Sequence, residues 1–233
     1  EIFFKILNNL YKKTNNKNLS LSGGCAQNSV ANGKILSNTK FDKIYISSSS
    51  GDSGGAIGAA TYFLSKKNIF LKKEEGAFYG PEFNDQQIQM SIEKNQIKLK
   101  DVKQIIFDTE DELVSFISKE ILEKKIVGWF QGKMEWGPRA LGNRSILANP
   151  AVANIKDIIN SKIKRRESFR PFAPSILEEY ANQWFNTDHE SLFMSFVTNV
   201  NNDKRHIIPS VVHTDGTGRL QTVNKKNNSR FYK

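Results

Sequence analysis

The spacing of apolar residues predicts a regular succession of elements in the first part of the chain. Residues 1–16 place apolar side chains three or four positions apart, as in an amphipathic helix. Short apolar runs at 19–21 and 41–46 predict strands, and helical patterns follow at 27–36 and 56–64. Two strand–turn–helix units in succession are typical of an α/β domain.

The pattern changes in the segment 66–85, which is highly charged and is interrupted by Gly76, Gly80 and Pro81. Such a segment is typical of a boundary between domains. We therefore divide the chain into three parts: a first domain at 1–70, a linker at 71–85 and a second domain at 86–233.

The second domain also mixes helical and strand patterns. Its clearest helix is 110–124, which begins with acidic residues and ends in lysines, as the helix dipole favours. The strand 126–130 has the apolar character of a buried strand. The other expected elements are helices at 86–94, 151–163 and 175–185, a strand at 145–147, and extended segments at 96–107, 192–200 and 207–223.

Composition excludes several classes of protein. Hydrophobic residues make up 38% of the 233 positions, too many for a disordered chain, and no apolar run approaches the ~20 residues of a membrane span. The first residues do not have the pattern of a secretory signal. The single cysteine, Cys25, excludes an internal disulfide and a multi-cysteine metal centre, and it is typical of a cytoplasmic protein.

The distribution of charge points to an anionic ligand. The net charge is +10, and over half of this excess lies in 133–170, where nine basic residues face three acidic ones. The densest part is the loop GKMEWGPRALGNRS at 132–145, in which basic residues alternate with Gly, Pro and Trp. Arginine forks and lysine ammonium groups match phosphate and carboxylate oxygens. The loop therefore favours anion binding over a solvated charged surface.

Two glycine-containing turns follow the first two predicted strands. In the turn 22–28, Gly23 and Gly24 would let the backbone approach a ligand, but a tight strand-to-helix turn needs glycines as well. In the segment GDSGGAIGAA, Asp52 is either a metal or nucleotide ligand or a helix N-cap. The first turn leaves both interpretations open, whereas the second, taken alone, favours the N-cap.

Two later segments carry further polar groups. The segment 164–174 combines basic residues with Pro171 and Pro174, which interrupt a basic helix and favour a preformed pocket over nucleic-acid binding. Further along, His213 and Asp215 lie two positions apart, on one face if the segment is a strand. A structural hydrogen bond explains this pair more simply than catalysis does.

These segments occur together, and in this order, in a known family. The chain resembles the carbamoyltransferases that include the NodU-type and antibiotic O-carbamoyltransferases. The resemblance covers about residues 18–233 and rests on six motifs: LSGGCAQNSVANGKI, SGDSGGAIGAA, GPEF, GKMEWGPRALGNRSILANP, FRPFAPSIL and HTDGTGRLQTV.

The resemblance implies a two-part enzyme with an α/β (α+β) fold. Residues 1–70 would be the end of an actin-like (ASKHA) domain, and 86–233 a YrdC-like α/β domain with a twisted open sheet, truncated at its end. It also implies that the chain, which starts at Glu1, is a piece of a longer enzyme and is inactive alone. A homodimer is compatible with it.

The chemistry implied by the resemblance has two steps. Carbamoyl adenylate is formed from carbamoyl phosphate and ATP with Mg²⁺ in the YrdC-like domain, and the carbamoyl group then passes to a hydroxyl of a sugar or antibiotic-like acceptor. Matching motif positions imply a catalytic pocket of Arg139, Lys164, Arg170 and Arg219. They imply further binding residues at Gly23, Gly24, Asn28, Asn143, Arg144, Ser145, His213 and Asp215. Asp52 would ligate Fe²⁺ or a similar ion, but its histidine partners would lie outside this chain, so we expect no tight metal site here.

Two rival functions stay open. A nucleic-acid-binding module would combine a basic groove with stacking aromatics, whereas Trp129, Phe130, Phe169 and Phe172 are expected in the core. A threonylcarbamoyl enzyme acting on tRNA would belong to the same superfamily, but GPRALGNRS and HTDGTGRLQTV speak against it. We expect small-molecule partners, with neither nucleic acid nor membrane among them.

Overall fold

The computed structural model of the chain describes residues 1–70, 76–95, 101–187 and 189–233. It combines helices with short strands, and the strands in these ranges form four two-stranded sheets. The expected mixture of helices and strands is confirmed, but the described part of the chain has these small sheets instead of one twisted open sheet. None of its described helices has the length and apolar character of a membrane span.

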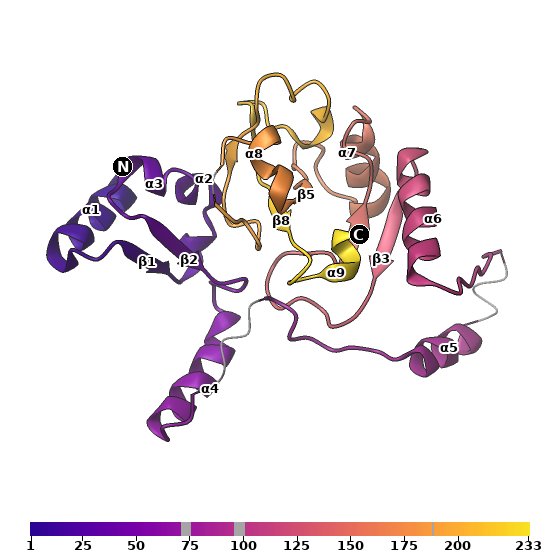
Figure 1. Cartoon of the computed structure of the whole chain (residues 1–233), viewed down its shortest axis with the longest axis horizontal. Helices are drawn as coiled ribbons and strands as arrows, with labels where there is room; N and C mark the ends of the chain where they lie inside the picture. Colours follow the sequence, from indigo (N-terminus) through magenta and orange to yellow (C-terminus); the bar gives the residue numbers. More distant parts are fainter. Residues whose placement is uncertain (71–75, 96–100, 188) are drawn as a thin grey trace.

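The first part of the chain is built on a pair of parallel strands (Figure 1). β1 (Asn18–Leu21) pairs in parallel with β2 (Lys43–Ile46), and α1 (Ile2–Thr14) packs beside them. Leu7 of α1 is buried with Leu19 of β1, because the apolar stripe of the helix faces the sheet. All three elements lie where the apolar spacing predicts them.

The helix expected at 27–36 is instead broken into short turns. These are a 3₁₀ turn (Gly24–Gln27), α2 (Ser29–Asn32) and α3 (Ile35–Asn38). The break lies at Gly33, where an added Cβ would collide with the carbonyl oxygen of Val197. A contact with a distant segment therefore interrupts a locally helical pattern.

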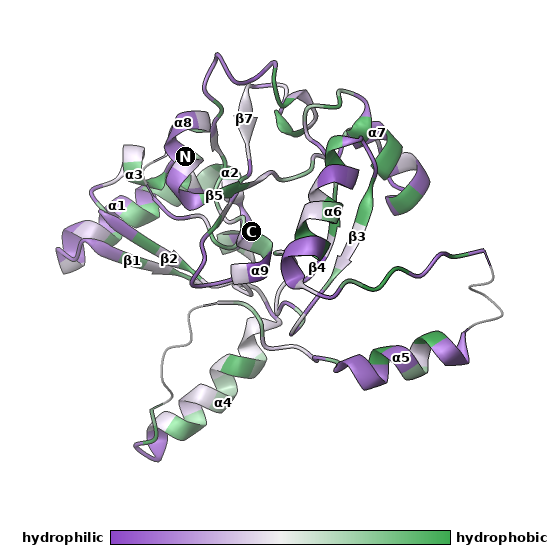
Figure 2. Cartoon of the chain, turned by 45° about the vertical axis from the view of Figure 1, so that its right-hand side comes forward, coloured by the Kyte–Doolittle hydropathy of each residue, from purple (hydrophilic) through white to green (hydrophobic). Residues whose placement is uncertain are grey.

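Two helices project from the rest of the molecule in both views (Figures 1 and 2). α4 (Gly54–Lys66) and α5 (Asp85–Lys94) have no buried residue, and each lies close to the range predicted for it. Part of the expected linker, 71–75, lies outside the described residues. Its described part contacts the loop after β3, since Trp136 N donates to Ala77 O and Gly80 N to Met134 O.

The second part of the chain begins with α6 and a hairpin. α6 (Glu110–Leu122) starts at a capping box between Thr109 and Glu112 and lies beside β3 (Val127–Phe130). β3 pairs antiparallel with β4 (Arg144–Leu147). α7 (Ile155–Ile158) then continues directly into a π-helix (Ile159–Lys164).

The remaining elements enclose a second core. It is centred on Phe185, Val200 and Leu220, which are buried together. Two further strand pairs form here: β5 (Ser175–Leu177) with β8 (Gln221–Val223) in parallel, and β6 (Thr198–Asn199) with β7 (Thr217–Gly218) antiparallel. The helical turns are 3₁₀ turns at Glu178–Tyr180 and Pro209–Val211, α8 (Ala181–Trp184) and α9 (Ser229–Tyr232).

One segment of the second part is inserted into the first. Phe196 is buried with Ala26 and Ile46, and Val197 N donates to Ser29 O at 2.9 Å. Asn32 is buried and donates from Nδ2 to Ser195 O at 3.0 Å. The two parts are thus joined by the buried Phe196 side chain and by hydrogen bonds to the backbone.

Several expectations for the second part are wrong. The helix expected at 175–185 begins as a strand, because Ser175–Leu177 pairs with β8 from far along the chain. The helix expected at 151–163 starts only at Ile155, after a turn in which Ala151 N donates to Asn149 Oδ1. Of the extended segment expected at 96–107, residues 96–100 lie outside the described residues, and 102–107 pair with no strand in the described part of the chain.

The expected burial of the aromatic residues is wrong at two positions. β3 is only half-buried, and its Phe130 is 55% exposed. Phe169 is 76% exposed. Trp129 and Phe172 are partly buried, and both line the cavity described next.

Candidate functional site

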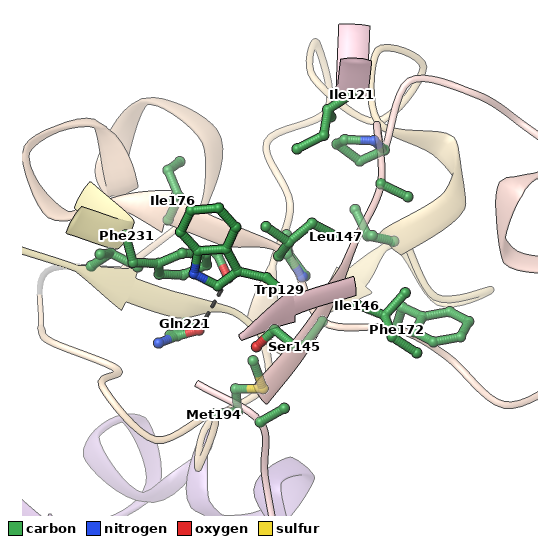
Figure 3. Close-up of a pocket in the computed structure, with 18 of the residues that line it drawn as sticks. Ile121, Trp129, Ser145, Ile146, Leu147, Phe172, Ile176, Met194, Gln221 and Phe231 are labelled. Atoms are coloured by element: carbon green, nitrogen blue, oxygen red, sulfur yellow. Dashed lines mark hydrogen bonds between the residues drawn. The ribbon is translucent and has the colours of Figure 1, made fainter. Parts of the chain in front are cut away.

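A cavity of about 630 Å³ opens in the second part of the chain. Its walls come from α6, the β3–β4 hairpin, the α7–π-helix segment, the segment 171–177 and the strands near Arg219 and Gln221. This volume is in the range that accommodates a nucleotide-sized ligand. Figure 3 shows Trp129, Leu147, Ile176 and Phe231 forming its apolar side.

The polar side of the cavity is basic. Five cationic side chains line it without an acidic ion-pair partner among the described residues: Arg139, Lys156, Lys164, Arg166 and Arg219. The described residues that line this cavity include no Asp or Glu. Two more cations at the rim, Arg230 and Lys233, are paired with Glu110 of α6. Cations that share a cavity without a counterion repel one another, and partial burial raises the cost of their charge, so the cavity is electrostatically complementary to an anion.

Arg219 shows this electrostatic cost most clearly. Burial, and then the charges of Arg139 and Arg166, lower the pKa of its guanidinium to about 10. Its Nε is buried and has no hydrogen-bond partner in the described part of the chain. Burial also lowers the pKa of Arg139. An anion between these groups would restore the hydrogen bonds and the charge balance that they lack.

The structure brings three of the four expected catalytic residues to this cavity. Arg139, Lys164 and Arg219 line it, but Arg170 does not. The Arg170 side chain is 52% exposed, and its Nε lies 2.8 Å from Glu167 Oε2. Arg166 lines the cavity instead, with Lys156 from α7. Sequence reasoning counted both within the basic stretch and did not single them out.

The loop after β3 is held by a buried carboxylate. Glu135 Oε1 accepts hydrogen bonds from the backbone N–H groups of Leu141 (2.7 Å), Asn143 (2.8 Å) and Arg144 (3.1 Å). This loop presents Arg139 to the cavity. The sequence analysis missed Glu135, although an acidic residue in a basic loop was the available signal.

The expected binding residues after Arg139 mostly hold the loop itself. Arg144 donates to the carbonyl oxygens of Gln131 (2.6 Å) and Asn143 (2.8 Å), and its guanidinium stacks 3.6 Å from the ring centre of Phe130. Asn143 donates to Lys133 O at 2.7 Å. Only Ser145 lines the cavity, where its Oγ accepts from Gly142 N.

His213 and Asp215 form a turn beside the cavity and are not among its lining residues. Asp215 Oδ1 accepts from the Thr217 hydroxyl at 2.7 Å, and that hydroxyl lies 2.9 Å from His213 Nδ1. Because the hydroxyl proton points to Asp215, Nδ1 is the protonated nitrogen of neutral His213. Burial, with Arg219 and Lys156 nearby, lowers the pKa of His213 despite the opposing charge of Asp215.

The expected residues of the first part gather at the carboxyl ends of β1 and β2. Gly23 has φ +95° and donates to Ser50 O at 2.7 Å, with Gly24 next to it. Asn28 caps α2 by accepting from Ala31 N. Asp52 is exposed in the neighbouring turn. These residues are close together but lie outside the basic cavity.

Asp52 does not form a complete metal site with the other described residues. No group of three or more His, Cys, Asp or Glu side chains that could hold an ion occurs in the described ranges. A single exposed carboxylate does not supply the three or four ligands that such ions take from proteins.

Comparison with known proteins connects both parts of the chain to one family. The family model for the carbamoyltransferase N-terminus matches residues 1–61, and the model for the carbamoyltransferase C-terminus matches residues 118–233. The second match includes every residue that lines the basic cavity except Val114 and Ile117.

Curated relatives are similar over almost the whole chain. Nodulation protein NolO of Bradyrhizobium diazoefficiens is 38% identical over 239 residues, which cover 99% of this chain and 42% of the relative. Nodulation protein NolNO of Sinorhizobium fredii is also 38% identical, over 99% of this chain and 34% of the relative. Nodulation protein U of B. diazoefficiens is 34% identical over 90% of this chain and 34% of the relative. The chain therefore spans about two-fifths or less of these relatives, and it belongs to the carbamoyltransferase family.

Proposed function

We propose that the chain is the C-terminal portion of an ATP-dependent O-carbamoyltransferase and that its basic cavity binds carbamoyl phosphate and ATP. The observation that carries this proposal is the set of unpaired cations around Arg219 in a cavity that has no carboxylate among its described lining residues. Both ligands are phosphate-bearing anions. The apolar wall around Trp129 would suit the flat base of the nucleotide.

The proposed reaction proceeds in two stages. Carbamoyl phosphate, ATP and one water give carbamoyl adenylate, pyrophosphate and inorganic phosphate. The acceptor's hydroxyl oxygen then attacks the carbamoyl carbon, the bond from that carbon to the AMP oxygen breaks, and the hydroxyl proton is released as AMP leaves. Arg139, Lys164 and Arg219 would bind the phosphates and stabilise the negative charge that develops on the leaving groups.

The division of labour between the two parts is also a proposal. Residues 86–233 would form the adenylate as a YrdC-like domain, and 1–70 would contribute to transfer as the end of an actin-like domain, with 71–85 between them. Gly23, Gly24 and Asn28 would contact the transferred group or its nucleotide. Asp52 would supply one ligand to Fe²⁺ or a similar ion whose histidine partners lie outside this chain, and no step is assigned to that ion here.

Isothermal titration of the 233-residue chain tests the proposal through binding, which can be measured without turnover. Carbamoyl phosphate and ATP should each bind, and Arg219→Met should weaken carbamoyl phosphate binding about tenfold or more, as expected for loss of a charged hydrogen-bonding group. The matched control is Arg170→Met, because Arg170 is exposed and paired with Glu167.

The outcomes are distinct. A large loss of affinity for carbamoyl phosphate in Arg170→Met would show that Arg170 takes part in binding after all. Salt-sensitive binding of a tRNA mixture, with no response to carbamoyl phosphate or ATP, would overturn the proposal in favour of a nucleic-acid function.

A further inference from the structure

A buried amide side chain holds one basic residue of the cavity wall in place. Asn160 is fully buried in the π-helix that also carries Lys164. Its Nδ2 donates to Ser168 O at 3.2 Å and to Arg170 O at 3.0 Å, and its Oδ1 accepts from Arg166 Nε at 2.7 Å. This side chain therefore fixes both the backbone of the following loop and one arginine side chain.

The backbone around Asn160 brings Arg166 back over the helix. Arg165 has φ +48°, a left-handed conformation that reverses the chain directly after Lys164. Arg166 N then donates to Asn160 O at 3.0 Å, so Asn160 holds Arg166 through both main chain and side chain. π-helical turns are frequent at functional sites, and here the turn lies in the cavity wall.

This arrangement orients the Arg166 guanidinium without neutralising it. One edge is held by the neutral amide of Asn160, and one face lies over the ring of Phe172, at 4.9 Å from the ring centre. Its two terminal nitrogens have no hydrogen-bond or ion-pair partner among the described residues, and Arg166 lines the cavity. A guanidinium fixed before the ligand arrives loses less entropy on binding.

We propose that Asn160 is a positioning residue of the anion site and acts by presenting Arg166 to a phosphate group. The proposal rests on the proposed function only in naming carbamoyl phosphate or ATP as the natural source of that phosphate. Asn160 itself does not contact the ligand, and its effect on binding requires Arg166.

A double-mutant cycle with inorganic phosphate and carbamoyl phosphate as probes tests this dependence. Asn160→Ala and Arg166→Ala should each weaken binding of both anions about tenfold. In the Arg166→Ala background, Asn160→Ala should have little further effect, because the group through which it acts is already absent. The matched control is Asn32→Ala, which removes an equally buried amide that holds backbone carbonyls elsewhere and should leave the affinity within about twofold.

A ligand-free measurement separates positioning from general destabilisation. The Arg166 Nε–H should exchange slowly with solvent in NMR spectra of the wild-type chain and of Asn32→Ala, and rapidly in Asn160→Ala. If Asn160→Ala does not fold, Asn160→Asp keeps an acceptor for Nε but adds a charge that neutralises Arg166. It should therefore weaken anion binding more in the wild-type background than in Arg166→Ala.

Each outcome has a separate meaning. Unchanged affinity and slow Nε–H exchange in Asn160→Ala, with a loss in Arg166→Ala, would overturn the positioning role and leave the proposed function intact. Losses for phosphate in both variants, without detectable carbamoyl phosphate binding by the wild type, would support positioning and overturn the proposed substrate. Equal, additive losses in the two variants would show that Asn160 acts independently of Arg166 and would also overturn the inference.

Discussion

Replacing Arg219 by Met should stabilise the ligand-free chain, because it removes a charge that is buried without a counterion. Burial, with Arg139 and Arg166 nearby, lowers the pKa of Arg219 by between two and three units, to about 10. At about 1.4 kcal/mol per pKa unit, this corresponds to a cost of about 3 kcal/mol for the charged form. Both states are charged below pH 10, so the full cost is present at pH 7. Partial access of water and imperfect packing of the thioether reduce the expected gain to about 1–2 kcal/mol.

The same substitution should weaken binding of carbamoyl phosphate, because the Arg219 charge that destabilises the ligand-free chain is the charge that attracts the anion. We therefore expect the free energy of urea unfolding to rise in phosphate-free buffer while the affinity for carbamoyl phosphate falls about tenfold or more. Adding carbamoyl phosphate should raise the stability of the wild type and have much less effect on Arg219→Met.

Arg170→Met is the control, because its charge is exposed and already paired with Glu167. Its unfolding free energy should change by less than about 0.5 kcal/mol. The reasoning would be refuted if Arg219→Met lowered the unfolding free energy as an ordinary core substitution does, or if it bound carbamoyl phosphate as tightly as the wild type.

Three further predictions concern other groups near the site. Burial holds the pKa of His213 below its ordinary value of 6.5, so the unfolded chain takes up a proton first, and the unfolding free energy should fall as the pH drops below about 6.5. His213→Asn should make the unfolding free energy in urea less dependent on pH between pH 7.5 and pH 5.5, and an unchanged dependence would contradict this. Glu135→Ala leaves three backbone N–H groups without their acceptor and should lower the free energy of urea unfolding by about 3 kcal/mol. Glu135→Gln keeps an acceptor oxygen and should lower it by about 1 kcal/mol, and equal losses in the two variants would argue against the hydrogen-bonding role. Phe196→Ala removes the apolar contact between the two parts and should lower the free energy of urea unfolding by about 3 kcal/mol. The two parts should then unfold in two separate transitions, and a single transition of unchanged midpoint would show that this contact does not couple them.

Elements whose signals are local could be predicted from the sequence. α6 is the clearest example, because its acidic first turn and amphipathic pattern are contained in one stretch of chain, with a capping box at Thr109. β1 and β2 were equally accessible, since their apolar runs are short and bounded by turns. These elements need no information from elsewhere in the chain.

Three of the failures depend on contacts that the local sequence pattern does not contain. Residues 175–177 have a pattern compatible with a helix, but they pair with β8, more than forty residues later. Gly33 ends α2 where Val197 packs against it. Phe130 lies in an apolar strand, yet its exposed face is covered by the Arg144 guanidinium. Sequence spacing does not contain these contacts, so the tertiary structure decided each case.

The sequence predicts the kind of ligand that the candidate site binds, but not each residue that lines it. A basic, glycine-rich loop between strands indicates anion binding, and Arg139, Lys164 and Arg219 do line one basic cavity. Arg144 belongs to the same motif, but its donors are used by backbone carbonyls, which makes it part of the scaffold. Residue type and spacing do not distinguish a cation that holds the loop from one that is available to a ligand.

Arg166 and Arg170 show what makes that distinction. They are four positions apart in one basic segment, and each has its Nε held by a neighbouring side chain. The partner of Arg170 is the carboxylate of Glu167, which neutralises its charge at the surface. The partner of Arg166 is the uncharged amide of Asn160, which fixes the guanidinium and leaves its positive charge facing the cavity. A neutral partner orients a cation while preserving its attraction for an anion. The buried amide of Asn160 therefore makes Arg166, and not Arg170, available to bind an anion in the cavity.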